Sequence, residues 1–243
     1  MSYRILLAGA AGAIGKRLTP LLRGAGHHVA GTTRTEAGAD ILRALGAEPV
    51  KVDVFDEEGL RHAVAAARPE IAIHQLTDLP PGLDPARMAA ATANNARIRD
   101  EGTRNLVKAA IAAGARRLIA QSIAWAYAPG ATPHSESDPL DDRAEGGRGV
   151  SVRGVIALEN WTLKSPPLAG VVLRYGQFYG PGTGVEAAAG SSPLHVDAAA
   201  YAAFLAIDRG SPGIFNVAEP NAHVATEKAQ AELGWRADFR LPP

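Results

Sequence analysis

Residues 9–15 read Gly-Ala-Ala-Gly-Ala-Ile-Gly, between a short apolar run, Arg4–Ala8, and a stretch with helical spacing, Ile14–Arg23. A buried strand, a glycine turn and a helix in this order let backbone N–H groups approach a pyrophosphate at the positive end of the helix dipole. The glycine spacing alone is weak in a chain with 26 glycines, but the strand–turn–helix context is the one that the motif requires. The turn therefore predicts a dinucleotide site with contacts from Gly9, Ala11, Gly12, Ala13, Ile14 and Gly15.

The same alternation of apolar runs and helical stretches continues along the chain. Strands that are apolar throughout, with helices between them, are typical of a parallel sheet covered on both faces. With right-handed crossovers, the pattern predicts an α/β fold with a doubly wound parallel sheet. The predicted strands are Arg4–Ala8, His28–Thr33, Pro49–Val52, Ile71–Leu76, Leu118–Ser122, Val171–Tyr175 and Ile214–Ala218. The predicted helices are Ile14–Arg23, Ala37–Leu45, Glu57–Ala67, Ala86–Ala113, Val152–Leu163, Val196–Asp208 and Ala225–Leu233.

The domain organisation is predicted to be simple, because no linker is long enough to separate two independently folding units. We expect a single domain over residues 1–243, in which residues 1–170 form mainly the dinucleotide-binding core. Residues 171–243 would form a shortened substrate-binding portion, interleaved with the last strands. Residues 128–149, rich in Pro, Gly, Asp and Ser, predict a surface loop.

The composition excludes several classes of protein. Lys+Arg and Asp+Glu are both 25, and a formal charge of zero argues against binding nucleic acid or an anionic membrane through bulk charge. A hydrophobic fraction of 47% and a charged fraction of 21% are those of a globular protein. The absence of cysteine excludes disulfides, Cys-ligated metals and a Cys nucleophile. The seven histidines show no metal-ligand spacing, so we expect no metal.

The longest apolar stretch, Ile5–Gly15, has 11 residues, whereas a membrane-spanning helix needs about 20. It contains three glycines and no cleavage-like site follows it, which argues against a signal peptide. We therefore expect a cytoplasmic protein with a small-molecule substrate and with neither nucleic acid nor membrane as a partner. A homo-oligomer stays open.

The end of the second predicted strand indicates which dinucleotide is preferred. An NAD site usually places Asp or Glu there to bind the ribose 2′-OH, but this chain has Thr33 and Arg34, 19 residues after Gly15. An arginine can bind a 2′-phosphate or stack on adenine, so we expect NADP(H) rather than NAD(H). A solvated arginine at a helix start is the alternative. Asp53 and Val54, after the third strand, either lie against adenine or cap the next helix.

Further motifs occur in order along nearly the whole chain, and together they are more specific than the glycine turn alone. They are residues 9–15 (GAAGAIG), 101–106 (EGTRNL), 117–122 (RLIAQS), 173–182 (LRYGQFYGPG), 195–197 (HVD) and 233–235 (LGW). With these motifs the chain resembles the extended short-chain dehydrogenase/reductase superfamily, in its NAD-dependent epimerase/dehydratase-like branch. The resemblance implies a Rossmann-type fold and oxidoreductase chemistry with NAD(P)(H).

The resemblance also implies roles for residues at the ends of later strands. Leu76 and Thr77, after the fourth strand, would contact the cofactor, and Ser122 would close the fifth strand beside the nicotinamide. The loop over residues 175–179 would lie across the nicotinamide and the substrate, with cofactor contacts from Tyr175 and Phe178 and a substrate contact from Gln177.

Working enzymes of this superfamily carry Tyr-x-x-x-Lys on the helix after the fifth strand, where the tyrosine transfers a proton and the lysine lowers its pKa. None of the five tyrosines here is followed by lysine four residues later. Alignment on residues 157–159 places Ser151 at the tyrosine position and Val155 at the lysine position. Ordinary ketone reduction is therefore in doubt. His134 and His74 are further possible bases, although a histidine inside a strand, as His74 is, is more often a buried structural residue.

Ser122, Tyr127 and Tyr179 are our candidates for catalytic contact with a substrate oxygen. Tyr127 is the first choice, because it follows Ser122 by five residues at the carboxyl end of the sheet, where ligands bind in such folds. Trp125 could stack on a planar ring, and Tyr127, Gln177 and Tyr179 are further candidates for substrate contact. Core packing or anchoring of a loop is the structural alternative for each aromatic residue.

The segments that would cover a substrate are short. Only 13 residues separate Pro181 from His195, and only 15 separate Val217 from Leu233, where related chains commonly hold much longer insertions. These lengths predict a small lid over a shallow pocket, which suits a flat substrate or a partner protein better than an enclosed sugar nucleotide.

Three functions stay open from the sequence. The first is an NAD(P)-dependent tailoring enzyme with a non-standard proton relay, acting by oxidoreduction or oxygenation on a small, flat substrate. Family analogy favours an aromatic, polyketide-like substrate. The second is a non-catalytic dinucleotide-sensing or regulatory protein, similar to superfamily members that lack the Tyr/Lys pair. The third is a sugar-nucleotide epimerase or dehydratase, against which the missing pair and the short lid count.

Overall fold

The structure, a computed structural model, describes residues 1–80 and 84–242. Its centre is a seven-stranded sheet in the order β3-β2-β1-β4-β5-β6-β9, and every neighbouring pair in it is parallel. The predicted α/β fold with a doubly wound parallel sheet is thereby confirmed. Its strands are β1 (Arg4–Ala8), β2 (His28–Thr33), β3 (Glu48–Lys51), β4 (Ile71–His74), β5 (Arg117–Ile123), β6 (Ala169–Tyr175) and β9 (Gly213–Val217).

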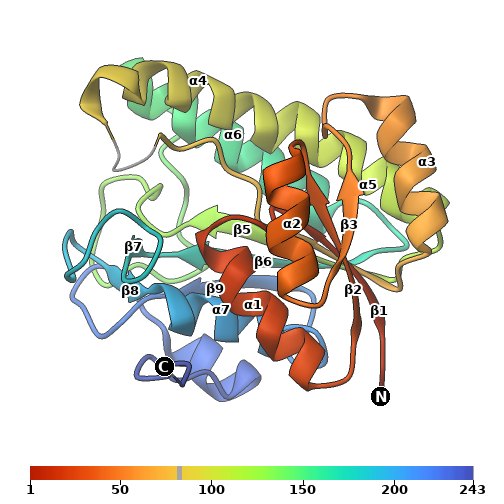
Figure 1. The fold of residues 1–243 in the computed structure, drawn as a ribbon. Helices are drawn as coiled ribbons and strands as arrows, with labels where there is room; N and C mark the ends of the chain where they lie inside the picture. The colour runs from red at the N-terminus through yellow and green to blue at the C-terminus, as the bar shows by residue number, and fades with distance from the viewer. Residues whose placement is uncertain (81–83, 243) are drawn as a thin grey trace.

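Helices cover both faces of the sheet (Figure 1). On one face α1 packs against α7, and on the other α3 packs against α5 and α4 against α6. The helices are α1 (Ala13–Gly24), α2 (Glu36–Ala44), α3 (Glu57–Ala67), α4 (Met88–Arg97), α5 (Thr103–Ala112), α6 (Gly146–Leu163) and α7 (Val196–Leu205). Strand order reverses between β1 and β4, which places a crevice at the carboxyl ends of these two strands.

Several segments differ from the sequence prediction. The single helix expected over residues 86–113 is divided into a 3₁₀ turn η2 (Pro85–Arg87), α4, a π-helical segment η3 (Ile98–Gly102) and α5. Helix α6 begins six residues before the predicted start. The prediction missed these residues because the glycine-rich first turns lack apolar periodicity. Two three-residue strands, β7 (Gln177–Tyr179) and β8 (Pro193–His195), form a small parallel sheet that periodicity cannot detect. The predicted last helix is reduced to a π-helical segment, η4 (Ala229–Leu233).

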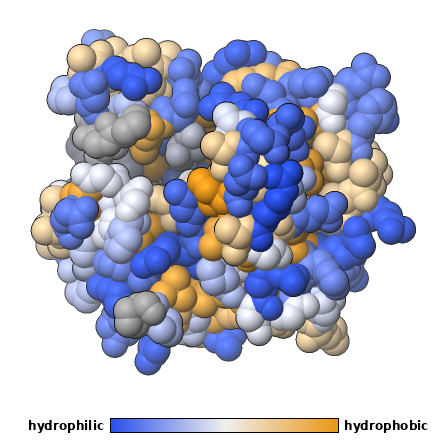
Figure 2. Space-filling model, in the orientation of Figure 1, coloured by the Kyte–Doolittle hydropathy of each residue, from blue (hydrophilic) through white to orange (hydrophobic). Residues whose placement is uncertain are grey.

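The largest apolar core lies between the sheet and the helices α1, α2 and α7, which pack on one of its faces. It joins residues from both ends of the chain, including Leu7, Leu18, Tyr175, Phe215 and Trp235. Figure 2 shows hydrophilic residues on the outer face of α2 and hydrophobic surface beside it. No helix of the described ranges 1–80 and 84–242 combines the length and the hydropathy that a membrane span needs.

Candidate functional site at the carboxyl edge of the sheet

The glycine turn has the geometry that the sequence predicts. Gly9 has a φ of 85°, and a Cβ there would come within 2.5 Å of the Gln75 carbonyl oxygen. The N–H of Gly12 donates to the Gly9 carbonyl at 3.0 Å, and a Cβ on Gly15 would overlap the carbonyl oxygens of Gly9 and Ala10. Because Gly12 is the extended N-cap residue of α1, the free N–H groups of the first helical turn lie directly behind it.

A cavity of about 230 Å³ opens beside this turn, along the carboxyl ends of β1 to β4. Its size suits one half of a dinucleotide. Of the predicted cofactor residues, nine line it: Gly9, Ala11, Gly12, Thr33, Arg34, Asp53, Val54, Leu76 and Thr77. Three others, Ala13, Ile14 and Gly15, lie in the first turn of α1. Ser122, Tyr175 and Phe178 do not line this cavity.

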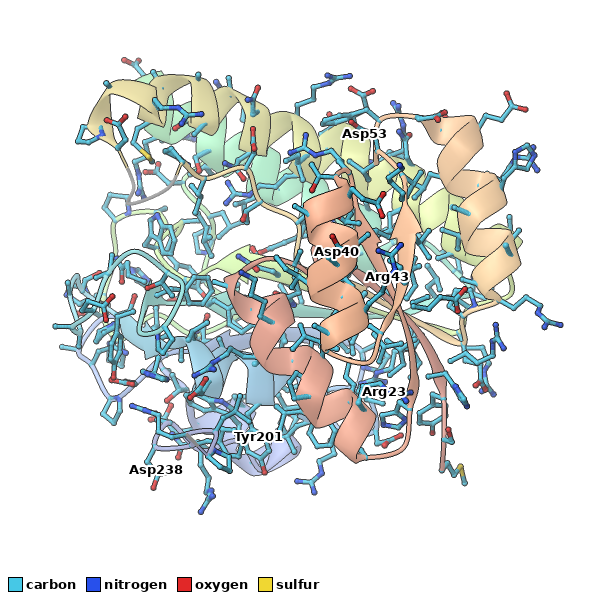
Figure 3. The ribbon with its side chains drawn as sticks, in the orientation of Figure 1. Arg23, Asp40, Arg43, Asp53, Tyr201 and Asp238 are labelled. Atoms are coloured by element: carbon cyan, nitrogen blue, oxygen red, sulfur yellow. The ribbon has the colours of Figure 1, made fainter. Side chains whose placement is uncertain are left out.

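The side chains at the far end of the cavity suit an adenosine group. Arg34 is 61% exposed and lies 3.7 Å from the Asp78 carboxylate, so its guanidinium is accessible to a ligand. The Asp53 carboxylate accepts the N–H of Phe55 at 2.9 Å, while Asp56 is the residue that caps α3. Of the two roles considered for Asp53, the cap is therefore filled by another residue, and Figure 3 shows Asp53 at the end of β3.

Gln75 is a polar residue of the cavity that the sequence analysis missed. It lines the cavity beside Gly9 and is 4% exposed, and neither polar atom of its side-chain amide has a hydrogen-bond partner within residues 1–80 and 84–242. Buried polar groups are nearly always hydrogen-bonded, so this amide is suited to a ligand or an ordered water. The one detectable sign was a glutamine within the apolar run over residues 71–76.

His74 is a buried, neutral histidine at the end of β4. Its Nδ1 accepts the N–H of Leu76 at 3.2 Å, and its Nε2 lies 3.0 Å from the Thr103 hydroxyl. Burial, and then the positive charge of Arg99, lower the pKa of His74 to about 4. With both ring nitrogens bonded inside the protein, His74 has the structural role considered as the alternative to a general base.

Ser122 belongs to a buried polar network rather than to the cavity. Its hydroxyl donates to the Glu159 carboxylate at 2.8 Å, and Arg174 forms an ion pair with the same carboxylate at 2.7 Å. The two charged side chains are only 8% and 4% exposed. The network joins β5, α6 and β6, so the Ser122 hydroxyl is occupied by a structural partner.

Tyr127 is also enclosed, which differs from the expectation that it faces the crevice. It is 5% exposed, its hydroxyl donates to the Asn216 side chain at 2.6 Å, and its ring stacks on His134 at 4.8 Å. Burial raises the pKa of Tyr127. His134 lies 3.1 Å from the Asp138 carboxylate. These contacts anchor the loop after β5, and the bond to Asn216, 89 residues away, has no local sequence pattern to indicate it.

The segment after β6 is likewise held by internal contacts. Tyr175 is fully buried and donates to the Ala199 carbonyl, and Phe178 packs on its ring at 5.5 Å. The side-chain amide oxygen of Gln177 accepts two hydrogen bonds of 2.9 Å from Ser192, one from its N–H and one from its hydroxyl. This pairing fastens the short lid strand β8 to β7.

Tyr179 is the most accessible of the three catalytic candidates. Its hydroxyl donates to the Glu219 carboxylate at 2.7 Å and accepts from Arg240 at 3.1 Å. Burial, and then the Glu219 carboxylate, raise the pKa of Tyr179. Trp125 differs from all of these, since 39% of it is exposed and its indole is free to stack on a planar ligand.

The two positions aligned with the Tyr/Lys pair lie on α6. Val155 is fully buried in an apolar cluster with Ile123, Ala126 and Val152. Ser151 is bonded through its hydroxyl to the guanidinium of Arg99 at 3.0 Å. The charged side chain that contacts Ser151 thus comes from η3, and no sequence motif pointed to it.

The part of the chain from β1 and the glycine turn to α7 matches the model of a protein family. Residues 5–201 match the NAD dependent epimerase/dehydratase family. The chain belongs to this family. A 3-diazoavenalumate denitrifying reductase of Streptomyces sp is 43% identical over 244 residues, which cover 89% of this chain and 76% of that protein. The uncharacterized protein y4nL of Sinorhizobium fredii is 34% identical over 198 residues, which cover 73% of this chain and 51% of that protein.

Solved structures of this epimerase/dehydratase fold resemble the chain over nearly its whole length. A UDP-glucose 4-epimerase from Thermotoga maritima with UDP-glucose has a TM-score of 0.77 at 20% identity and covers 99% of this chain and 94% of its own. WbmG from Bordetella bronchiseptica, in complex with NAD and UDP, has a TM-score of 0.72 at 22% identity, and the match covers 99% of this chain and 91% of WbmG. At these identities the likeness shows the fold.

The family match and the reductase relative together indicate that the chain is an NAD-dependent oxidoreductase-type enzyme. Its residues fit a dinucleotide, because the glycine turn leaves space that a Cβ would fill and the buried Gln75 amide has no partner among the described residues. Within the part of the chain that the structure describes, no group of His, Asp or Glu side chains could hold a metal ion.

Proposed function

We propose that the chain is an NAD(P)H-dependent reductase of a tailoring pathway, and that it reduces a small, planar, aromatic substrate without a proton from the usual tyrosine position. The observation that carries this proposal is the surroundings of Ser151 and Val155 on α6, the two residues that align with the Tyr/Lys pair. Val155 is fully buried among apolar residues, and Ser151 has a hydroxyl bonded to Arg99. A hydroxyl with an alcohol's high pKa is a poor general acid near neutral pH.

The substrate class follows from which reductions need a proton donor. Reduction of a carbonyl takes up a hydride and a proton, whereas replacement of a diazonium group takes up a hydride and releases N₂: Ar–N₂⁺ + H⁻ → Ar–H + N₂. When bound, the nicotinamide dinucleotide supplies the hydride. The Streptomyces relative is named as a denitrifying reductase of a diazo compound. We therefore propose an aromatic diazo compound as the substrate class, and reduction rather than oxygenation as the reaction.

The chain's own residues have distinct parts in this proposal. The N–H groups behind the Gly9–Gly15 turn would hold the pyrophosphate, and the cavity at the ends of β2 and β3 would hold the adenosine. Arg34 would bind a 2′-phosphate, which favours NADP(H) over NAD(H). Trp125, partly exposed beyond the end of β5, would stack on the aromatic ring.

The test uses benzenediazonium as the probe, under anaerobic conditions, with NADPH or NADH. We expect oxidised dinucleotide and N₂ in equal amounts, at a rate well above the uncatalysed reaction. The Gly12→Asp variant, which should not bind the dinucleotide, gives the background rate. Benzaldehyde serves as the matched carbonyl probe, and we expect it to be reduced far more slowly.

Two results would contradict the proposal. Faster reduction of benzaldehyde than of benzenediazonium would mean that the protein does supply a proton. Tight dinucleotide binding with no turnover of either probe would favour the dinucleotide-sensing alternative.

A further inference from the structure

Arg99 is a cation of η3, between α4 and α5 and close to the end of β4. Its neighbour in the chain, Ile98, lines the nucleotide cavity, and its guanidinium donates to the hydroxyl and the carbonyl of Ser151 at 3.0 and 3.4 Å. Its charge also reaches His74, at the end of β4, where it contributes to lowering the histidine pKa. These contacts place Arg99 between the cavity and the first turns of α6.

The local backbone explains why an arginine is presented here. Residues 98–102 form the π-helical segment η3 between α4 and α5. A π-helical turn holds an extra residue, which rotates the following side chains relative to an α-helix, and such turns are frequent at functional sites. Two residues earlier, Arg97 shows the ordinary arrangement, since it is 56% exposed and pairs with Glu101 at 2.7 Å.

Arg99, unlike Arg97, has no carboxylate partner among residues 1–80 and 84–242. Its only hydrogen-bond acceptors there are the two oxygens of Ser151, although a guanidinium carries five N–H groups. Burial without a neighbouring acid lowers the pKa of Arg99 to about 10. A partly buried cation without an anion costs free energy that a bound anionic group would offset.

We propose that Arg99 binds an anionic oxygen group, a carboxylate, on the planar substrate. The inference deepens the proposed function and rests on it for the planar substrate, but it concerns binding and not hydride transfer. The dinucleotide phosphates are a less suitable partner, because α1 lies on the opposite face of the sheet from η3. An anion bound by the N–H groups of Arg99 that do not contact Ser151 would set the position of the substrate ring near the end of β4.

The experiment compares two planar probes that differ in charge, cinnamate and its neutral analogue cinnamamide. Binding is measured by calorimetry with the protein saturated in NADP⁺. We expect the wild type to bind cinnamate more tightly than cinnamamide. Arg99→Gln should weaken cinnamate about ten- to a hundred-fold and leave cinnamamide nearly unchanged, since a charge-assisted bidentate contact is lost. Arg99→Lys should recover part of the affinity, because lysine restores the positive charge but not the paired N–H donors of the guanidinium.

Arg97→Gln is the matched control, as it removes an exposed arginine from the same helical stretch. Arg97 stacks on Phe55 of the nucleotide cavity, so the control is read with NADP⁺ saturating, and under that condition it should change neither affinity. Equal loss of both probes in Arg99→Gln would assign a purely structural role, tying η3 to α6. Loss of NADP⁺ affinity in Arg99→Gln would show that the cofactor is the partner. No preference for cinnamate in the wild type would overturn the proposal outright. Because none of these readouts needs turnover, an enzyme inactive on diazonium would contradict only the proposed function.

Discussion

At the scale of single residues, Gly12 allows binding to be separated from folding. Its backbone is extended at the N-cap of α1, a position where aspartate is a preferred residue. Gly12→Asp should therefore fold, with a melting temperature close to that of the wild type. Its carboxylate would occupy the place of the pyrophosphate, so calorimetry should detect no NADP⁺ binding. Gly12→Ala is the size control: its Cβ would lie 3.2 Å from the Gly9 carbonyl oxygen, a tight contact that a shift of a few tenths of an ångström relieves, and it should still bind.

Arg34 should decide the preference between the two dinucleotides. Arg34→Ala should weaken NADP⁺ binding about tenfold and NAD⁺ binding much less, a modest effect because the side chain is 61% exposed and screened by water. The matched control is Arg43→Ala in α2, an exposed arginine that pairs with Glu36 and Asp40. If the wild type prefers NAD⁺, Arg34 does not bind a 2′-phosphate and is a solvated surface residue.

Which residues of the site could be predicted depended on how local their interactions are. The glycine turn and Arg34 follow from motifs within a few positions of each other, and the structure brings them to one cavity. Tyr127, by contrast, donates to Asn216, which lies 89 residues further along the chain. Arg99 and Gln75 are distinguished by the partners they lack in the described structure, and only three-dimensional packing reveals that.

At the scale of secondary-structure elements, the buried ion pair between Glu159 and Arg174 joins α6 to β6. Arg174→Met would leave the Glu159 carboxylate buried without its cation, and should lower the free energy of unfolding by about 3–5 kcal/mol. The double variant Glu159→Leu, Arg174→Met removes both charges and should lose less. Urea unfolding of the two variants measures the difference. A double variant less stable than the single one would show that the charged pair itself stabilises the fold.

The seven strands of the main sheet were predictable because each is a short apolar run, and the structure places all of them within two residues of the predicted bounds. The elements that were missed carry no periodicity. Strands β7 and β8 have three residues each, and the first turn of α6 reads Gly-Gly-Arg-Gly. The π-helical segment η3 looks like ordinary helix in the sequence, because one extra residue in a turn leaves the local composition unchanged.

At the scale of the whole molecule, His74 makes stability depend on pH. Its folded pKa is about 4, whereas an exposed histidine has about 6.5. Between these values the unfolded chain binds a proton that the folded protein does not, so the free energy of unfolding falls as the pH falls. The loss reaches about 3 kcal/mol below about pH 4.

His74→Asn keeps an acceptor for the Leu76 N–H but does not titrate. Urea midpoints at about pH 7 and about pH 5 should differ less in this variant than in the wild type. Equal differences in both proteins would mean that His74 is protonated in the folded state, and that its environment is more polar than its burial implies.

We propose that residues 1–243 fold as a single domain, although residues 1–170 carry the cavity. The main core supports this, since Leu18 of α1 and Leu7 of β1 share it with Phe215 of β9 and Trp235. Arg17 of α1 is also paired with the buried Asp197 of α7 at 2.6 Å.

That pairing has a consequence for how the protein is made. Arg17 and Asp197 are 180 residues apart, and at about 5–20 residues per second a ribosome needs roughly ten to forty seconds between them. Throughout this interval the apolar side of α1 has emerged without the helix that covers it. The nascent chain therefore exposes an apolar surface for much of its synthesis. A stalled or truncated translation product would keep this surface exposed, so it would bind chaperones and express poorly in soluble form.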